Sequence, residues 1–63
     1  MTVRELAASR GFSVEGKLRR VKDGKFGIDG HYPVYIDEGG NEYWMSNDGV
    51  TGGCIVTKDG GVL

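Results

Sequence analysis

Residues 32–46 read YPVYIDEGGNEYWMS, and this stretch decides the fold. Two runs rich in β-branched and aromatic residues flank the polar sequence Glu38-Gly39-Gly40-Asn41, which is typical of a tight turn between antiparallel strands. A turn centred on Gly39-Gly40 predicts a hairpin with a defined register. The predicted pairs are Ile36 with Tyr43, Tyr35 with Trp44, and Val34 with Met45.

This register assigns side chains to the two faces of the hairpin, because successive residues of a strand point to opposite sides. Tyr35 and Trp44 face one another on one side, where cross-strand aromatic pairs are favourable. The opposite side is the predicted core face. It carries Val34, Ile36, Tyr43 and Met45.

The rest of the chain after Phe12 has the same texture, with short apolar runs separated by glycine next to Asp or Asn. Turns are predicted at residues 22–24, 29–30, 38–41, 47–49 and 59–61, and strands at 13–21, 25–28, 32–37, 42–46 and 54–57. Connections this short join antiparallel neighbours. A bulge near Arg19-Arg20 would bring Val21 back to the apolar face, and Gly52-Gly53 favours a second bend.

The N-terminal residues predict a short helix. Thr2 and Glu5 form a capping-box pattern, Leu6 falls on an apolar helical face, and Gly11 stands where a left-handed cap is expected. The predicted helix covers residues 3–10, and Phe12 is placed to fold back on its last turn. The predicted fold is α+β and mostly β: this helix, then a four- to five-stranded antiparallel meander forming a strongly curved sheet or a small, partly open SH3-like barrel.

Size and composition exclude several protein classes. Sixty-three residues suffice for one domain, so we expect residues 1–63 to fold as a unit with a small core. A single cysteine, Cys54, and a single histidine, His31, give no internal disulfide and no structural zinc site. No apolar run has the length of a signal peptide or a membrane span, so we expect a cytoplasmic protein that does not associate with a membrane. We also expect no bound cofactor.

Charge is distributed unevenly along the sequence, although the net charge is only −1. Residues 1–25 contain seven basic and three acidic side chains, a net charge of +4. Residues 26–63 contain Lys58 and six acidic side chains, a net charge of −5. Such asymmetry can mark a binding face, or it can cancel where the segments interleave in the folded domain.

Motifs that carry chemistry are matched only in part. Residues 11–18 have the spacing of a phosphate-binding loop but end in Leu18 instead of Ser or Thr. Residues 2–13 resemble half of a helix-turn-helix, yet glycine-rich β sequence follows where a recognition helix should lie. Residues 37–41 approach calcium-loop spacing, but Glu42 replaces the required glycine. We therefore expect no catalytic or metal-binding residues.

The candidate site is the aromatic pair Tyr35 and Trp44, extended by Tyr32. Such residues dominate binding energy at protein interfaces and also stack on single-stranded nucleic acid. An alternative is that the helix covers the pair with Leu6 and Phe12, which makes it a second small core. Beside or across from the pair runs a basic stretch, which consists of Lys17, Arg19, Arg20 and Lys22.

Three segments, TVRELA at 2–7, DEGGNEY at 37–43 and CIVTKDG at 54–60, resemble small accessory proteins of bacterial mobile elements and prophages. The resemblance implies no activity, only a bacterial protein that acts by binding something larger. Together with the missing catalytic motifs, it favours a non-enzymatic protein-binding module, with a homodimer through sheet edges as a further possibility. The alternative is a small nucleic-acid-binding barrel that uses the basic strand and aromatic stacking, although a pI near 5.7 weakens it.

Overall fold

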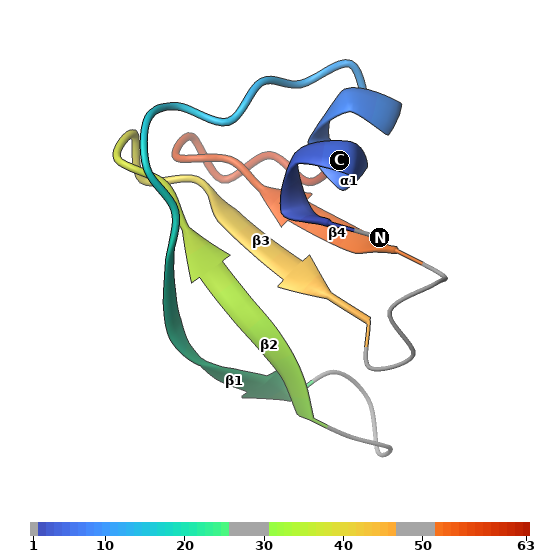
Figure 1. Ribbon diagram of the computed structural model, residues 1–63, viewed down its shortest axis with the longest axis vertical. Coiled ribbons are helices and arrows are strands. Elements are labelled where there is room, and N and C mark those ends of the chain that lie inside the picture. The colour runs from blue at the N-terminus through green and yellow to red at the C-terminus, as the bar shows by residue number, and fades with distance from the viewer. Residues whose placement is uncertain (1, 26–30, 47–51) are drawn as a thin grey trace.

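The fold of residues 2–25, 31–46 and 52–63 is described by a computed structural model. One helix, α1 (Val3–Ser9), precedes an antiparallel sheet of four strands in chain order. The strands are β1 (Arg19–Lys25), β2 (His31–Ile36), β3 (Glu42–Met45) and β4 (Gly53–Val56). The predicted helix followed by a mostly β, antiparallel meander is confirmed (Figure 1).

Both ends of α1 follow the predicted capping chemistry. The Glu5 backbone N–H donates to Thr2 Oγ1 at 3.1 Å, and the Thr2 N–H donates to Glu5 Oε1 at 2.7 Å. At the other end Gly11 adopts a φ of 70°, and the Phe12 N–H donates to the Ala7 carbonyl at 2.9 Å. This arrangement satisfies helix-end groups that would otherwise lack intrahelical partners.

The core lies between α1 and one face of the sheet. Leu6 and Ala7 of the helix pack with Tyr43 and Ile55 of the central and final strands. Phe12 closes the cluster from the end of the helix, with its ring centre 6.3 Å from that of Tyr43. The helix lies over the β4 side of the sheet, and the chain then crosses to the opposite edge to begin β1 (Figure 1).

The segment before β1 differs from the predicted strand at 13–21. Residues 12–18 belong to no strand, because their polar groups bond to the β2–β3 turn rather than to a sheet neighbour: the Glu38 N–H donates to the Glu15 carbonyl at 2.9 Å. Gly16, at a φ of 76°, interrupts the extended backbone. Val14 and Leu18 still pack against the core.

The predicted turn at residues 22–24 is also wrong. β1 continues through it, and Asp23 and Gly24 pair with Pro33 and Tyr32 of β2. An Asp-Gly pair favours a turn, but here both residues belong to one continuous ladder. The predicted bulge is confirmed by a register shift between Arg20 and Lys22. Residues 26–28, and the predicted turns at 29–30 and 47–49, lie outside the described residues.

The β2–β3 hairpin is confirmed, but its predicted register is wrong by one residue. Val34 pairs with Trp44, Tyr35 with Tyr43, and Ile36 with Glu42. The turn has three residues, 38–40, rather than two: the Asp37 N–H donates to the Asn41 carbonyl at 3.1 Å, and Gly40 has a φ of 93°. An odd loop length shifts the pairing by one and exchanges the faces of one strand relative to the other.

This shift separates the predicted aromatic pair. Tyr35 lies on the helix face, where it packs against the core, while Trp44 lies on the opposite face. Of the predicted pair, only Tyr35 lies on the face that carries the helix. Val34 and Ile36, predicted for the core face, lie with Trp44, whereas Tyr43 and Met45 belong to the core as predicted.

The two edges of the sheet differ. The outer edge of β4 is covered by the last residues of the chain, since Ile55 and Leu63 exchange backbone hydrogen bonds of 3.2 and 2.8 Å and Val56 bridges to Val62. The predicted turn at 59–61 precedes this pairing. β1 and β4 do not pair with each other, so the sheet is open. In the described part of the chain, no helix has the length and apolar character needed to cross a membrane.

Candidate functional site

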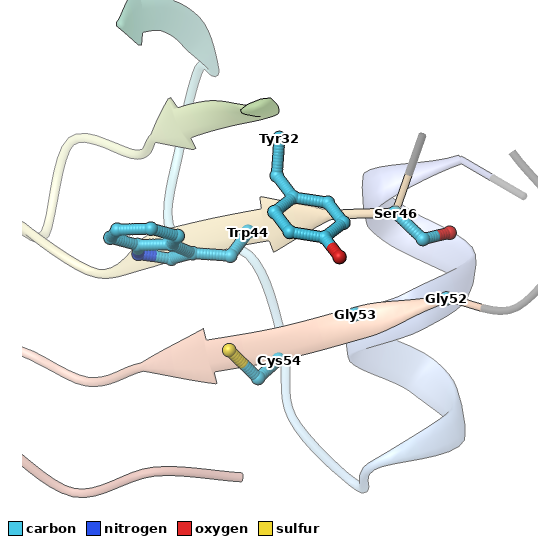
Figure 2. A pocket seen from close by; sticks show the side chains of 6 residues that line it. All are labelled: Tyr32, Trp44, Ser46, Gly52, Gly53 and Cys54. Atoms are coloured by element: carbon cyan, nitrogen blue, oxygen red, sulfur yellow. The ribbon is translucent and has the colours of Figure 1, made fainter. Parts of the chain in front are cut away.

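A hollow of about 250 Å³ lies on the face of the sheet opposite α1, here called the outer face. Tyr32 from β2, Trp44 from β3 and Cys54 from β4 stand around it, with α1 behind the sheet (Figure 2). All three side chains are half-buried. The remaining lining residues are Ser46, Gly52 and Gly53.

The register explains why these residues meet. Trp44 is directly opposite Val34 in β2 and Cys54 in β4, and Tyr32 shares the face of Val34 because it is two residues away. Val34, which is opposite Trp44 and two residues from Tyr32, is only 1% exposed. The Trp44 indole N–H donates to Glu42 Oε1 at 3.0 Å and fixes the orientation of its ring.

Two glycines give the hollow its shape. Gly53 faces Met45 in the ladder, and a Cβ at Gly53 would collide with the Trp44 carbonyl oxygen. The strands can approach this closely only because position 53 has no side chain. The preceding Gly52, at a φ of 87°, accepts a hydrogen bond of 2.8 Å from the Ser46 N–H. One wall of the hollow therefore consists of backbone.

Cys54 is half-buried in the lining of the hollow. Burial raises the pKa of its thiol, and the positive charge of Arg10 opposes that effect only in part. A thiol with a raised pKa is mostly protonated at neutral pH and is a poor nucleophile. Its contribution to this hollow is apolar contact rather than covalent chemistry.

The other predicted site residues do not join this hollow. Tyr35, Arg19 and Arg20 line a groove between α1 and strands β1 and β2, and Lys17 lines a third hollow with Ile36. Lys22 pairs with Val34 in the ladder, and its side chain is not described. The structure thus keeps Tyr32 with Trp44, whereas Tyr35, Lys17, Arg19 and Arg20 line other surfaces.

Sequence reasoning missed Cys54 and the two glycines as parts of the site. The signal was present in Gly52-Gly53-Cys54, because two residues without side chains precede a small apolar one. This pattern indicates a site only when Cys54 is known to pair with Trp44. That pairing joins two strands, β3 and β4, that are separated in the sequence by residues 47–51. Short-range sequence patterns do not determine such a register.

A polar cluster beside the β2–β3 turn is the main buried polar feature of the described residues. Asp37 and Asn41 are 5% and 0% exposed. The Asp37 carboxylate accepts hydrogen bonds from the Tyr43 hydroxyl at 2.6 Å, the Glu15 N–H at 3.0 Å and the Asn41 N–H at 2.9 Å. Asn41 Oδ1 accepts from the Lys58 N–H at 3.0 Å and so connects the cluster to the C-terminal turn.

These contacts set the ionisation of the cluster. Burial opposes the charge on Asp37, but hydrogen bonds from Tyr43 and from the Glu15 and Asn41 backbones outweigh it and hold its pKa well below the usual range. Burial, then the hydrogen bond and the charge of Asp37, raise the pKa of Tyr43. Asp37 is thus a charged structural acceptor whose lone pairs are already used by N–H and O–H donors.

Metal ligation has no support in this arrangement. Among the residues with described positions, no three His, Cys, Asp or Glu side chains lie close enough together to hold an ion. Comparison with known proteins gives no further guidance: no family model, no curated protein and no solved structure matches this chain.

Proposed function

We propose that this chain is a non-enzymatic protein-binding module, and that the hollow formed by Tyr32, Trp44 and Cys54 receives an apolar side chain of the partner. The observation that carries the proposal is the position of Trp44 beside Tyr32 in a concave site on the face opposite the helix. Trp and Tyr in pockets are the residues that most often dominate binding energy at protein interfaces.

The size of the hollow supports a side chain rather than a cofactor. Pockets for drug-sized ligands have volumes of roughly 300–1,000 Å³. The hollow, at about 250 Å³, is below that range, and none of its described lining residues is charged and able to orient a small polar substrate. A large aliphatic or aromatic side chain needs neither a larger pocket nor a charged partner, because burial of its apolar surface against the two rings is itself favourable.

Acid–base chemistry finds little support among the described groups. Asp37 is the buried carboxylate among the described residues, and its oxygens already accept six hydrogen bonds from groups around the β2–β3 turn. The Cys54 thiol has a raised pKa. A binding role is also what the resemblance to accessory proteins of mobile elements implies.

The same proposal includes a strongly curved architecture and a partner that is not a second copy of this chain. The bulge in β1 supports a strongly curved, SH3-like sheet, because bulges increase local twist. Pairing between copies would have to use β1, since the C-terminal residues cover β4. β1 carries four basic residues against one acidic residue, and like charges disfavour pairing with its own copy. We therefore propose a different protein as the partner.

The test is affinity capture from a bacterial cytoplasmic lysate with three immobilised proteins: wild type, Trp44→Ala and the control Val62→Thr. Val62 is apolar and 69% exposed but does not line the hollow. We expect at least one protein that wild type and the control retain equally and Trp44→Ala loses. With that protein purified, Trp44→Ala should weaken Kd by about 30-fold, the effect of losing a hot spot.

A second variant addresses the possibility that Trp44→Ala alters folding. Cys54→Leu keeps both rings and fills part of the hollow, so it should weaken binding while the far-UV circular dichroism stays that of wild type. A captured protein that binds Trp44→Ala and Cys54→Leu as tightly as wild type would refute the proposal, as would capture of no specific protein.

A further inference from the structure

A second concave surface lies on the helix face of the sheet and is independent of the outer hollow. It is a groove of about 630 Å³ between the start of α1 and strands β1 and β2. Ser46 is the one described residue that lines both surfaces. The residues that line the groove are Thr2, Val3, Arg4, Leu18, Arg19, Arg20, Pro33, Tyr35, Met45 and Ser46.

The charge of this groove differs from that of the whole chain. Arg4, Arg19 and Arg20 line it, and none of its described lining residues is acidic, although the chain has a net charge of −1. Arg4 is held in place by a hydrogen bond of 3.1 Å from its Nη2 to the Gly16 carbonyl, which leaves its positive charge uncompensated by that contact. Arg20 is opposite Tyr35 in the ladder and thus shares its face.

Apolar side chains form the rest of the groove. Val3, Met45 and the half-buried Leu18 and Tyr35 are part of the core or pack against it, so the floor of the groove is continuous with the core. A surface with arginines above an apolar floor complements a ligand with carboxylates and apolar side chains on one segment.

We propose that this groove binds an acidic peptide segment of a partner protein, whose apolar side chains contact the floor and whose carboxylates face Arg4 and Arg20. A peptide fits better than a nucleic acid for two reasons. The groove offers one aromatic ring, Tyr35, and that ring packs on the core, whereas single-stranded nucleic acid is bound on several stacking rings. Binding of a continuous polyanion also needs a strongly basic footprint, and this chain has a pI of only about 5.7.

The test uses three fluorescein-labelled probes and fluorescence anisotropy with the whole chain at low salt. The first probe is a twelve-residue peptide of equal parts Glu, Leu and Gly, the second has Gln in place of every Glu, and the third is a twelve-nucleotide oligothymidylate. The acidic peptide should bind at least about tenfold more tightly than the Gln peptide, and its affinity should fall as salt screens the charges.

Protein variants place the binding in the groove. Arg4→Gln and Arg20→Gln should each weaken the acidic peptide by about 3- to 5-fold, as expected for partly exposed ion pairs, and the double variant by about tenfold or more. The matched control Lys58→Gln removes an exposed positive charge outside the groove and should bind like wild type. Urea midpoints equal to that of wild type show that the variants fold.

Three results would overturn the proposal. They are equal binding of the acidic and Gln peptides, tighter binding of oligothymidylate than of the acidic peptide, and wild-type affinity in the double arginine variant. The comparison of probes needs no altered protein, so it decides the question even if a variant fails to fold. Failure here is also distinct from failure of the protein-binding proposal above, which depends on Trp44 and Cys54.

Discussion

Asp37 shows how one residue fixes the local structure of this small protein. Its carboxylate collects donors from the arm before β1 (Glu15), from the turn (Gly39 and Asn41) and from the core (Tyr43). A buried charge is tolerated only when its hydrogen-bonding capacity is met, and it becomes costly when one partner is removed. Asp37 therefore connects the arm before β1, the β2–β3 turn and the core by hydrogen bonds.

Replacement of this carboxylate should destabilise the fold in a pH-dependent way. Asp37→Asn places an amide donor against existing donors, and we expect a loss of about 2–4 kcal/mol in the free energy of unfolding at pH 7. The folded-state pKa of Asp37 lies below its unfolded value of about 3.9. Its stabilisation is hence complete above that unfolded pKa and is lost as pH falls through the folded pKa.

Urea unfolding between pH 2 and pH 7 measures this effect. Wild type should lose stability as pH falls below about 4, and Asp37→Asn should lose most of that slope. A small slope should persist from Glu5, whose pKa is lowered by hydrogen bonds from the backbone and side chain of Thr2. Asp59→Asn, at an exposed turn position, is the control and should match wild type. Parallel pH profiles for Asp37→Asn and wild type would contradict the assignment.

Gly53 is the second residue whose identity the structure requires. A methyl group there meets the backbone of Trp44, which cannot rotate away, so Gly53→Ala should separate β3 from β4 and cost about 1–3 kcal/mol. Gly11→Ala is an instructive comparison, because Gly11 has open space but a φ of 70°. It should cost about 1–2 kcal/mol through backbone strain alone.

The two glycine variants are distinguished by Trp44 fluorescence as well as by urea unfolding. Gly53→Ala should shift the emission spectrum, since it displaces the strand that carries Trp44, whereas Gly11→Ala should leave the spectrum of the folded state unchanged. An unshifted spectrum with full stability in Gly53→Ala would mean that the strands do not approach as closely as described.

Among the elements, the loop 38–40 is short, but its length sets the register of the β2–β3 hairpin. Its third residue, Gly40, takes the positive φ that a three-residue hairpin loop needs, and Asp37 accepts from the N–H groups inside the loop. Because the loop has three residues, Tyr35 lies on the core face with Tyr43, and Tyr32 and Val34 lie on the outer face with Trp44. The position of the candidate site thus depends on one loop residue.

Deletion of Gly39 tests this dependence. A two-residue loop favours the alternative register, in which Trp44 pairs with Tyr35 and Tyr43 moves relative to its core partners on β2. We expect loss of the cooperative urea transition, since the buried pair Asp37 and Asn41 cannot form. Gly39→Ser keeps the loop length. Its Cβ would displace the exposed, flexible Glu15 side chain, which is a smaller change than a register shift, so this control should remain folded. A folded deletion variant with wild-type Trp44 emission would contradict the register argument.

At the scale of the whole molecule, the chain protects one edge of its sheet with its own C-terminal residues. Ile55 is fully buried and forms two backbone hydrogen bonds with Leu63. The other edge, β1, has a bulge and several basic residues, both of which discourage pairing with other strands. The open sheet is therefore protected at its two edges by different means.

Removal of residues 61–63 should expose the β4 edge. Loss of the two hydrogen bonds of Ile55 should cost about 1–3 kcal/mol and allow copies to associate through the free edge. Leu63→Ser retains the backbone and removes the apolar side chain, so it should stay closer to wild type. Urea unfolding and light scattering after size exclusion measure both effects. A stable monomer after truncation would show that the edge pairing contributes little.

Local sequence patterns determined the elements and only part of their arrangement. The capping box, the glycine after the helix, the bulge in β1 and the Asp37–Asn41 hairpin follow from short-range chemistry: each depends on residues a few positions apart. The same patterns correctly indicated Tyr43 and Met45 as core residues, and Tyr32 and Trp44, which they indicated as candidate site residues, line the outer hollow. They predicted too early a start for the strand at 13–21 and a turn at 22–24, because Gly16 and Asp23-Gly24 were interpreted by their local preferences alone.

Tertiary structure decided which face each aromatic residue occupies and what lies beside it. The buried polar cluster of Asp37, Asn41 and Tyr43 includes Glu15, more than twenty residues earlier, and the C-terminal turn, so its effect on the loop could not be seen from the hairpin sequence. The three-residue loop places Tyr35 on the core face and brings Tyr32 to the outer face beside Trp44. Registers are set by such long-range contacts, and a shift of one residue exchanges the faces of a strand.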